Sequence, residues 1–234
     1  MHIFFAPNIA NTLELPEEES LHCTKVLRLT EGVEILIADG KGRFHKARIA
    51  RAHHKRCGVE LLATFEDDSC REYGVHIAIA PTKNLDRMEW FAEKATEIGI
   101  DSITFIRSRY SERKELKLER IQKILVSAMK QSMKATVPEM DTMIEFVELM
   151  NRPFNGKKYI AHCHENDERR LFSKEQLAGE NVLVLIGPEG DFSQEEVDLA
   201  IKSGFEPISL GKSRLRTETA ALVACHTIHL LNNL

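Results

Sequence analysis

The segment from Asn181 to Ala224 reads NVLVLIGPEGDFSQEEVDLAIKSGFEPISLGKSRLRTETAALVA, and it contains two apolar runs that end in glycine-containing loops. Val182–Ile186 is an unbroken apolar run, which predicts a strand buried on both faces. The following Gly187-Pro188-Glu189-Gly190 can neither extend that strand nor begin an ordinary helix. Pro207–Leu210 predicts a second strand, which runs into Gly211. We therefore predict a parallel sheet whose carboxyl edge carries both loops, the edge at which α/β proteins bind ligands.

Each loop precedes a predicted helix. Ser193 and Glu196 form a capping-box pair at the start of the first helix, and Gly204 stops it. The second helix begins near Thr217. Helix starts offer free N–H groups and glycines allow a ligand close to the backbone, so two such loops favour a binding site over two ordinary turns. No dinucleotide or NTP phosphate motif is present in the sequence.

The two loop motifs resemble those of the RsmE family. Leu185–Phe192 and Leu210–Ala220 match the family in order and at a sensible spacing. Members of the family use S-adenosylmethionine to methylate N3 of a uridine in small-subunit (16S) ribosomal RNA. The family belongs to the SPOUT class, so the resemblance implies an α/β fold: a C-terminal domain with a trefoil knot, preceded by a small PUA-like β-barrel. The knot is implied by the resemblance alone, because general topology rules disfavour knots.

The chain of 234 residues divides into two predicted domains, with a polar linker at 66–69. The first, residues 1–70, alternates as short strands around an Asp39-Gly40 turn and resembles the family's RNA-binding PUA-like domain. The second, residues 71–234, alternates strands and helices and is the expected methyltransferase domain that binds S-adenosylmethionine. The expected strands and longer helices are 33–38, 43–50, 59–65, 75–80, 84–99, 102–106, 116–134 and 159–162.

Composition points to a globular protein. Its 43% hydrophobic and 29% charged residues are typical of that class, and no apolar run is long enough to span a membrane. The chain start lacks the features of a signal peptide, and the five scattered cysteines suit reduced thiols, so we expect a cytoplasmic protein. His162-Cys163-His164 lacks a second ligand pair at a suitable spacing, so we expect no metal.

The net charge of −4 hides a basic segment. Lys25–Arg56 holds nine Lys and Arg against Glu31, Glu34 and Asp39, a local charge of +6. A solvated face is the simpler interpretation, but so one-sided a segment in an acidic protein favours a surface that holds RNA phosphates. The expected RNA-binding residues are Arg28, Lys41, Arg43, Lys46, Arg48 and Lys134.

Position 134 departs from the family pattern. The segment Gln131-Ser132-Met133-Lys134 stands where family members usually carry Gln-Ser-Gly-Arg. Lys134 keeps the positive charge of the arginine but lacks its bidentate fork, which puts the role of this position in doubt.

The implied chemistry requires a uracil base to be held flat while its N3 loses a proton and meets a methyl group in line. Arg216 is the expected group that stabilises negative charge on the uracil carbonyls. Glu218 is expected to accept a proton or to orient Arg216, although an ordinary ion pair at a helix start is the alternative. The cofactor-binding residues implied by the resemblance are His164, Ile186, Gly187, Pro188, Glu189, Gly190, Leu210, Gly211, Ser213, Leu215, Thr219 and Ala220.

Two other functions stay open from the residues alone: methylation of another RNA position such as a ribose 2′-hydroxyl, and RNA binding without catalysis. The intact glycines of the loops argue against the second. The last helix, from Thr217 to Leu231, is apolar around most of its circumference, so it is either covered by its own domain or packed in a twofold homodimer. The resemblance favours the homodimer, because SPOUT enzymes usually pair through helices next to the knot.

Overall fold

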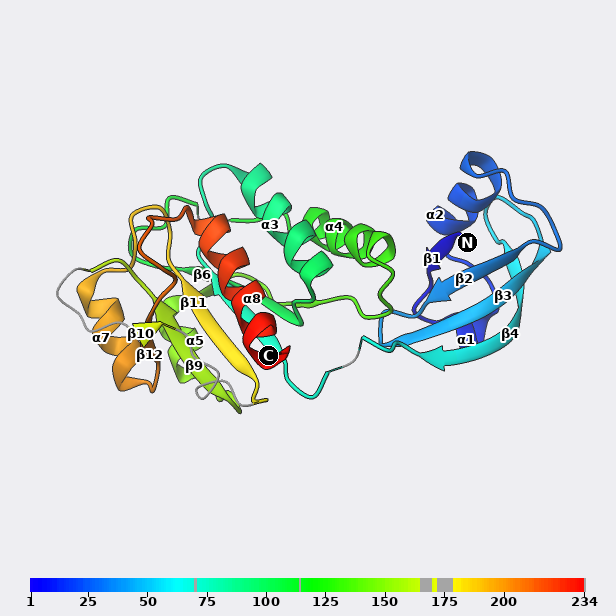
Figure 1. Cartoon of the computed structure of the whole chain (residues 1–234). Coiled ribbons are helices and arrows are strands. Elements are labelled where there is room, and N and C mark those ends of the chain that lie inside the picture. Colours follow the sequence, from blue (N-terminus) through cyan, green and yellow to red (C-terminus); the bar gives the residue numbers. More distant parts are fainter. Residues whose placement is uncertain (70, 114, 165–169, 172–178, 234) are drawn as a thin grey trace. The chain divides into compact units, whose positions relative to one another are not determined.

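The computed structural model describes residues 1–69, 71–113, 115–164, 170–171 and 179–233, and it divides into two compact units (Figure 1). The first unit comprises Met1–Cys70 and Val126–Val137, and the second comprises Arg71–Leu125 and Pro138–Leu234. The segment 126–137 therefore belongs to the first unit, whereas we had assigned it to the C-terminal domain. It contains the last residues of helix α4 (Leu118–Gln131), so one helix runs from the second unit into the first.

The first unit is built on a four-stranded sheet in the order β1-β2-β3-β4. The three strands that the sequence predicts are present as β2 (Glu34–Ala38), β3 (Arg43–Arg51) and β4 (Gly58–Glu66), paired antiparallel. The parallel strand β1 (Ile3–Phe5) was not predicted. Short helices precede β2, and they are α1 (Ile9–Thr12), α2 (Glu17–Leu21) and a π-helical turn, η1 (His22–Val26).

The segment 126–137 packs on this sheet through apolar and polar contacts. Met129 and Ala135 are buried in one cluster with Leu36 and Phe44 of the sheet. Lys130 Nζ lies 2.6 Å from Glu19 Oε1, and the N–H group of Ala135 donates to Asp67 Oδ2 at 2.7 Å. These contacts explain why the end of α4 belongs to the first unit. Lys134 lies within this segment, so it too belongs to the first unit.

The second unit is an α/β domain around a parallel sheet (Figure 1). The described strands follow the order β10-β12-β9-β11-β5-β6-β7, with β8 paired to β6, and every pairing is parallel. Their bounds are β5 (Val75–Ile79), β6 (Ser102–Arg107), β7 (Glu139–Met140), β8 (Ile144–Glu145), β9 (Lys157–Ala161), β10 (Arg170–Leu171), β11 (Val182–Ile186) and β12 (Glu206–Ser209). The predicted strand at 182–186 is confirmed as β11, buried along its whole length between β5 and β9.

Helices cover both faces of this sheet. Helix α3 (Leu85–Ile98) packs beside α8 (Thr217–Asn233), which contacts β5 and β11. Helices α5 (Phe146–Asn151) and α7 (Gln194–Lys202) share the other core with Leu183 and Leu185 of β11. The capping box of Ser193 and Glu196 at the start of α7 is confirmed, with both reciprocal hydrogen bonds formed. Asn84 caps α3, and Gly99 ends it with a φ of 116°.

Of the helices in the described part of the chain, none is long and apolar enough to cross a bilayer. The cysteines in this part are Cys23, Cys57, Cys163 and Cys225, and all four are free thiols.

Candidate functional site

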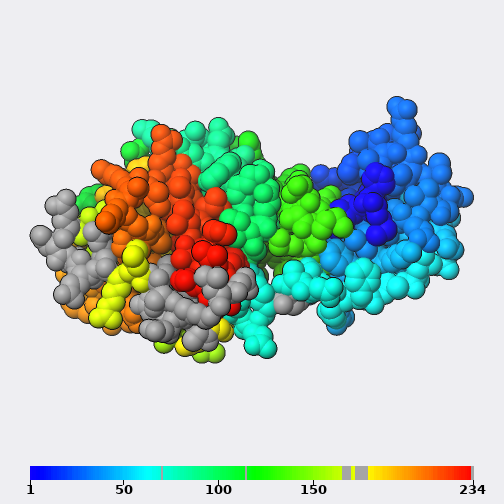
Figure 2. All heavy atoms as spheres, viewed as in Figure 1, coloured from blue at the N-terminus to red at the C-terminus, as the bar shows by residue number. Residues whose placement is uncertain are grey.

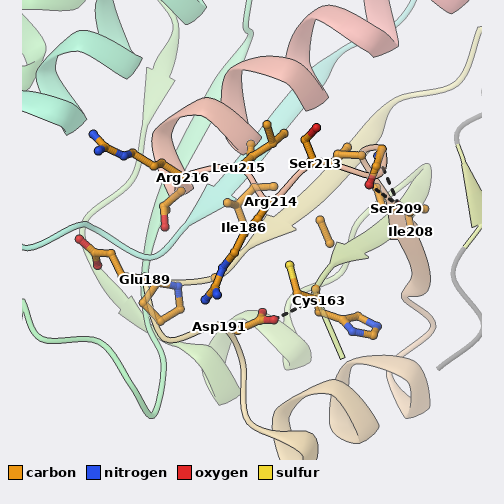
Figure 3. A pocket seen from close by; sticks show the side chains of 18 of the residues that line it. Cys163, Ile186, Glu189, Asp191, Ile208, Ser209, Ser213, Arg214, Leu215 and Arg216 are labelled. Carbon is orange, nitrogen blue, oxygen red and sulfur yellow. Dashed lines mark hydrogen bonds between the residues drawn. The ribbon is translucent and has the colours of Figure 1, made fainter. Parts of the chain in front are cut away.

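A cavity of about 410 Å³ lies at the carboxyl ends of β12, β9 and β11, which are neighbours in the sheet (Figure 3). Ile186, the last residue of β11, is level with Ala161 of β9, and Ile208 of β12 is level with the same residue from the other side. Because these parallel strands end together, their exit loops converge on one space. Its volume is within the range of sites that bind small molecules and cofactors.

Most of the cofactor-binding residues expected from the sequence line this cavity. Both glycine loops contribute, although they are more than twenty residues apart in the chain. The expected cofactor-binding residues in the lining are Ile186, Gly187, Pro188, Glu189, Leu210, Gly211, Ser213, Leu215 and Ala220, and the expected catalytic residue Arg216 lines the cavity as well. The cavity lining does not include His164, Gly190, Thr219 or Glu218.

The loop after β11 is held in a defined shape by Asp191. This residue adopts a left-handed φ of 64°, and its carboxylate accepts two backbone hydrogen bonds, from Cys163 at 2.7 Å and from Phe192 at 2.8 Å. The first of these bonds ties the loop to the exit of β9. On the other side, Glu189 Oε1 accepts the N–H group of Lys83 at 3.1 Å. The β11 loop is therefore anchored both to the β9 exit and to the segment between β5 and α3.

The loop after β12 owes its course to Gly211. Its φ is 118°, a conformation that residues with a side chain rarely adopt, and a Cβ atom placed there would meet no protein atom within 4 Å. Ser209 Oγ accepts the N–H group of Gly211 at 3.3 Å and donates to its carbonyl oxygen at 3.2 Å. The loop thus presents open backbone at the cavity, as the sequence predicted for a ligand that must approach closely.

Glu218 forms no ion pair with Arg216, the residue that we expected it to orient if it did not accept a proton itself. Glu218 is buried at the start of α8, and its Oε1 lies 3.8 Å from Nε of Arg87 on α3. Arg216 is exposed and forms no ion pair with any residue that the structure describes. In Figure 3 its side chain points away from Ile186, whereas the side chain of Arg214 extends toward Asp191. The sequence could not reveal the actual partner, because Arg87 is 131 positions from Glu218 and meets it only through the packing of α3 on α8.

The exit of β9 contributes different residues from the one expected. His164 turns away from the cavity, and its Nε2 lies 2.8 Å from the carbonyl oxygen of Phe192. The cavity is lined instead by Ala161, His162 and Cys163, which come directly at the strand end. The structure ends β9 at Ala161, one residue before the end of the predicted strand at 159–162, so His162 lies in the exit loop and not in the strand. The other lining residues that sequence reasoning missed are Arg87, Asp191, Ile208, Ser209 and Thr217.

Most of the positive charges in the basic segment of the first unit are paired with glutamate side chains, which its local sequence does not indicate. Lys46 pairs with Glu34 at 2.7 Å, Arg43 with Glu66 at 3.0 Å, and Arg48 with both Glu34 and Glu60. Glu14 neutralises Arg51 and Arg56, at 2.7 and 3.0 Å. Three of these glutamates, Glu14, Glu60 and Glu66, lie outside the segment Lys25–Arg56, so the local charge of +6 does not include them.

Arg28 and Lys41 differ from Arg43, Lys46 and Arg48, since neither forms an ion pair within the described part of the chain. Arg28 also has a left-handed φ of 52°. Lys134 lies close enough to Asp67 to help lower the pKa of that carboxyl group, together with hydrogen bonds from Ala135 and Ser69 that outweigh the opposing effect of burial. Of the predicted RNA-binding residues, only Arg28 and Lys41 therefore carry a side-chain charge that is in no ion pair and affects no carboxylate pKa among the described residues.

Comparison with known proteins matches both parts of the chain to domains of RNA methyltransferases. The model of an RNA methyltransferase domain matches residues 70–229, and that of an RNA methyltransferase PUA domain matches residues 15–62. A relative from Mesomycoplasma hyopneumoniae, ribosomal RNA small subunit methyltransferase E, is 32% identical over 95% of this chain and 96% of its own. A clustering of three or more metal-ligating side chains is not found among the described residues.

Solved structures extend this likeness to the whole fold. A probable rRNA-methyltransferase from Porphyromonas gingivalis is 42% identical, with a TM-score of 0.92 over 100% of this chain and 99% of its own. Ribosomal RNA small subunit methyltransferase E from Neisseria gonorrhoeae, solved with bound S-adenosylmethionine, is 29% identical, with a TM-score of 0.84 over 99% of this chain and 98% of its own. The chain belongs to the RNA methyltransferase family of ribosomal RNA small subunit methyltransferase E.

Proposed function

We propose that this protein is a methyltransferase that uses S-adenosylmethionine to methylate small-subunit ribosomal RNA. The observation that carries the proposal is the cavity at three neighbouring strand ends, in a chain that matches a cofactor-bound relative over almost its whole length. The cavity wall suits the ligand: Ile186, Ile208 and Leu215 provide apolar surface for an adenine ring, and Glu189 and Asp191 provide carboxylates for an amino group. We place the adenosine part against 186–190 and 210–215.

The bound cofactor supplies an electrophilic methyl group on a sulfonium, which needs no metal. The protein's own tasks are to hold the acceptor in line with this methyl group and to exclude water. We propose that the acceptor is N3 of a uridine. Because N3 carries a proton that must leave, a nearby cation favours the reactive anion. Arg216 at the cavity wall can supply donors to a uracil carbonyl, and the buried carboxylate of Glu218 can accept a proton.

We propose that residues 1–70 form the RNA-binding domain, a PUA-like barrel on which the segment 126–137 packs, and that the rest of residues 71–234 form the methyltransferase domain. Arg28 and Lys41 would contribute most to phosphate binding, since exposed ion pairs such as that of Lys46 with Glu34 already neutralise their neighbours. Replacing both by glutamine should reduce the slope of log affinity against log salt by about 1.4–1.8, since each phosphate contact contributes about 0.7–0.9. Lys46→Gln is the matched control and should change the slope less.

We infer a twofold homodimer that packs through α8. Ala221, Ala224 and Ile228 face their own unit, which accounts for one side of the helix. Leu230 is 49% exposed, and atoms of α8 (red) are visible at the surface in Figure 2. An apolar helix side without a cover favours a second copy of the chain. Light scattering at micromolar concentration should give twice the chain mass, and a monomer with full activity would contradict the dimer.

We also infer the trefoil knot of the SPOUT class. After β12, which lies beyond β9, the chain passes through 210–216 and returns to the middle of the sheet, where α8 contacts β5 and β11. This return course supports a threaded chain. Pulling the protein by both ends should leave an unfolded length shorter than that of an unknotted chain, and the full length would contradict the knot.

The methylation itself is tested by incubating the protein with small-subunit RNA and isotope-labelled S-adenosylmethionine, followed by mass mapping of nucleotides. The proposal predicts label on the base of one uridine, at N3. Label on a ribose would instead identify the 2′-hydroxyl enzyme. RNA binding without label would identify the non-catalytic alternative, which calorimetry would support if the cofactor gave no heat.

A further inference from the structure

The ion pair of Arg87 with Glu218 is an unusual feature at the wall of the cavity. Arg87 is on the first turn of α3 and lines the cavity, and Glu218 is on the first turn of α8. The side chain of Glu218 is only 9% exposed, and that of Arg87 is 33% exposed. The pair brings together two helix starts that the sequence analysis did not connect.

Several hydrogen-bond donors and acceptors of Arg87 and Glu218 have no partner among the described residues. The 3.8 Å between Nε of Arg87 and Oε1 of Glu218 is too long for a hydrogen bond. Oε2 of Glu218 is buried and has no hydrogen-bond partner within the part of the chain that the structure describes. The terminal nitrogens of Arg87 likewise make no hydrogen bond to a described residue. A buried charged group without such partners is costly, and a catalytic role is one of the reasons for which proteins retain it.

We propose that Arg87 is a catalytic residue that contacts the target uracil and stabilises its N3 anion, and that Glu218 is a positioning residue that keeps the guanidinium in place. This inference rests on the proposed uridine methylation. The planar guanidinium offers paired donors to a uracil carbonyl oxygen next to N3. Arg216, by contrast, is exposed and pairs with no carboxylate among the described residues, so nothing there fixes its guanidinium for this task.

The chemical step balances without a further reactant. The proton of N3 leaves to water, and the electron pair that remains on N3 forms the new N–C bond to the methyl group. The electron pair of the breaking C–S bond stays on sulfur, which becomes a neutral thioether. The cation of Arg87 lowers the pKa of N3 and so raises the fraction of uracil that is anionic at neutral pH. The other titratable or charged side chains facing the cavity are His162, Cys163, Glu189, Asp191, Arg214 and Arg216.

The experiment compares Arg87→Ala, Arg87→Lys and Glu218→Gln by methylation rate from pH 6 to 10, with cofactor affinity measured by calorimetry. Arg87→Ala should lower kcat about 100-fold at pH 7, while cofactor affinity changes by less than about threefold. Its rate should continue to rise at pH values where that of the wild type has levelled off, because N3 without the cation titrates higher. Arg87→Lys keeps the charge and should recover part of the rate at neutral pH. Glu218→Gln should lose about tenfold.

Arg120→Ala is the matched control. Arg120 also pairs with a carboxylate of α3, Glu89 at 2.6 Å, but it does not line the cavity. The control should keep the rate and the pH profile of the wild type. A wild-type rate and pH profile in both Arg87 variants would overturn the role of Arg87, while the wild-type protein still methylated uridine. A wild-type protein that methylated no uridine would instead refute the proposed function itself.

Discussion

The two edges of the parallel sheet each carry a cavity, and the cavities differ in how their polar groups are used. The cavity at the carboxyl edge measures about 410 Å³ and the one at the amino edge about 380 Å³. At the amino edge, Arg152 lies 2.7 Å from Asp141, and Arg71 lies 2.8 Å from Asp101. His76 is bonded there as well, with its Nε2 2.8 Å from Thr104 Oγ1.

The carboxyl edge has the opposite character. Arg214 and Arg216 form no ion pair with the described residues, and the buried carboxylate of Glu218 has an oxygen without a partner. Two cavities of similar size can therefore serve different purposes. Polar groups that satisfy one another stabilise the fold, whereas groups left unsatisfied at a glycine-lined edge are available to a ligand. Changes at one edge should alter binding, and changes at the other should alter stability.

Gly211→Val should show the largest effect of the four changes, and the effect should be a loss of affinity for S-adenosylmethionine. The added side chain occupies open space at the cavity loop and disfavours the φ of 118°, so affinity for S-adenosylmethionine should fall at least 100-fold, or about 3 kcal/mol. Gly32→Val is the matched control, because Gly32 also has a left-handed φ of 88° and open space around its Cβ. Both variants should lose about 1–2 kcal/mol of stability, and only the first should lose binding in calorimetry. Equal cofactor affinity in the two variants would remove the loop from the site.

The amino edge should govern stability in acid through His76. Burial lowers the pKa of this side chain to about 4, against the opposing effect of Asp141, while the unfolded value is 6.5. The unfolded chain therefore binds the proton first as pH falls, and about 3 kcal/mol of stability present above pH 6.5 is lost by pH 4. Urea unfolding at pH 7, 5.5 and 4 measures the loss, which should be smaller in His76→Gln. An equal pH dependence in that variant would assign the loss to other groups.

Asp191→Ala should have an intermediate effect at the carboxyl edge. The change removes the acceptor of two backbone hydrogen bonds that tie the β11 loop to β9, from Cys163 and Phe192. Because the loop would then sample other conformations, cofactor affinity should fall about tenfold, roughly 1.4 kcal/mol. Asp198→Ala on α7 is the control and should bind normally, since the one described side-chain donor to Asp198 is Gln194, a neighbour on the same helix. Normal binding by Asp191→Ala would show that the loop keeps its shape without this anchor.

Met133→Gly should show the smallest effect and should touch neither edge. Met133 is 53% exposed and has a left-handed φ of 56°, at the position where the family usually carries glycine. Glycine relieves the strain but adds entropy to the unfolded chain, so the expected gain is at most about 1 kcal/mol of unfolding free energy. Thermal denaturation should show a small rise in Tm with unchanged cofactor affinity. A lower Tm would mean that the side chain contributes more than its exposure indicates.

Local patterns in the sequence predicted the parts of the site that depend on neighbouring residues. The apolar run at 182–186, the capping box at Ser193 and the loop at Gly211 all lie within single segments, and the structure contains each of them. The pair of Arg87 with Glu218 could not be predicted, because it depends on how two distant helices pack. The ion pairs of the basic segment were missed for the same reason, since Glu60 and Glu66 reach it only across the pairing of β3 with β4. Strands of two residues, such as β7, are too short to leave a periodic pattern.

The measurement that tests the division between the two edges most directly is hydrogen exchange of the unmodified protein, with and without S-adenosylmethionine. The cofactor should slow amide exchange at 161–163, 186–191 and 209–217, the segments that surround the carboxyl-edge cavity. Exchange at 74–76, 101–102 and 152–154, which line the amino-edge cavity, should stay the same. Protection confined to the amino edge, or no protection at either edge with saturating cofactor, would contradict the assignment of the site.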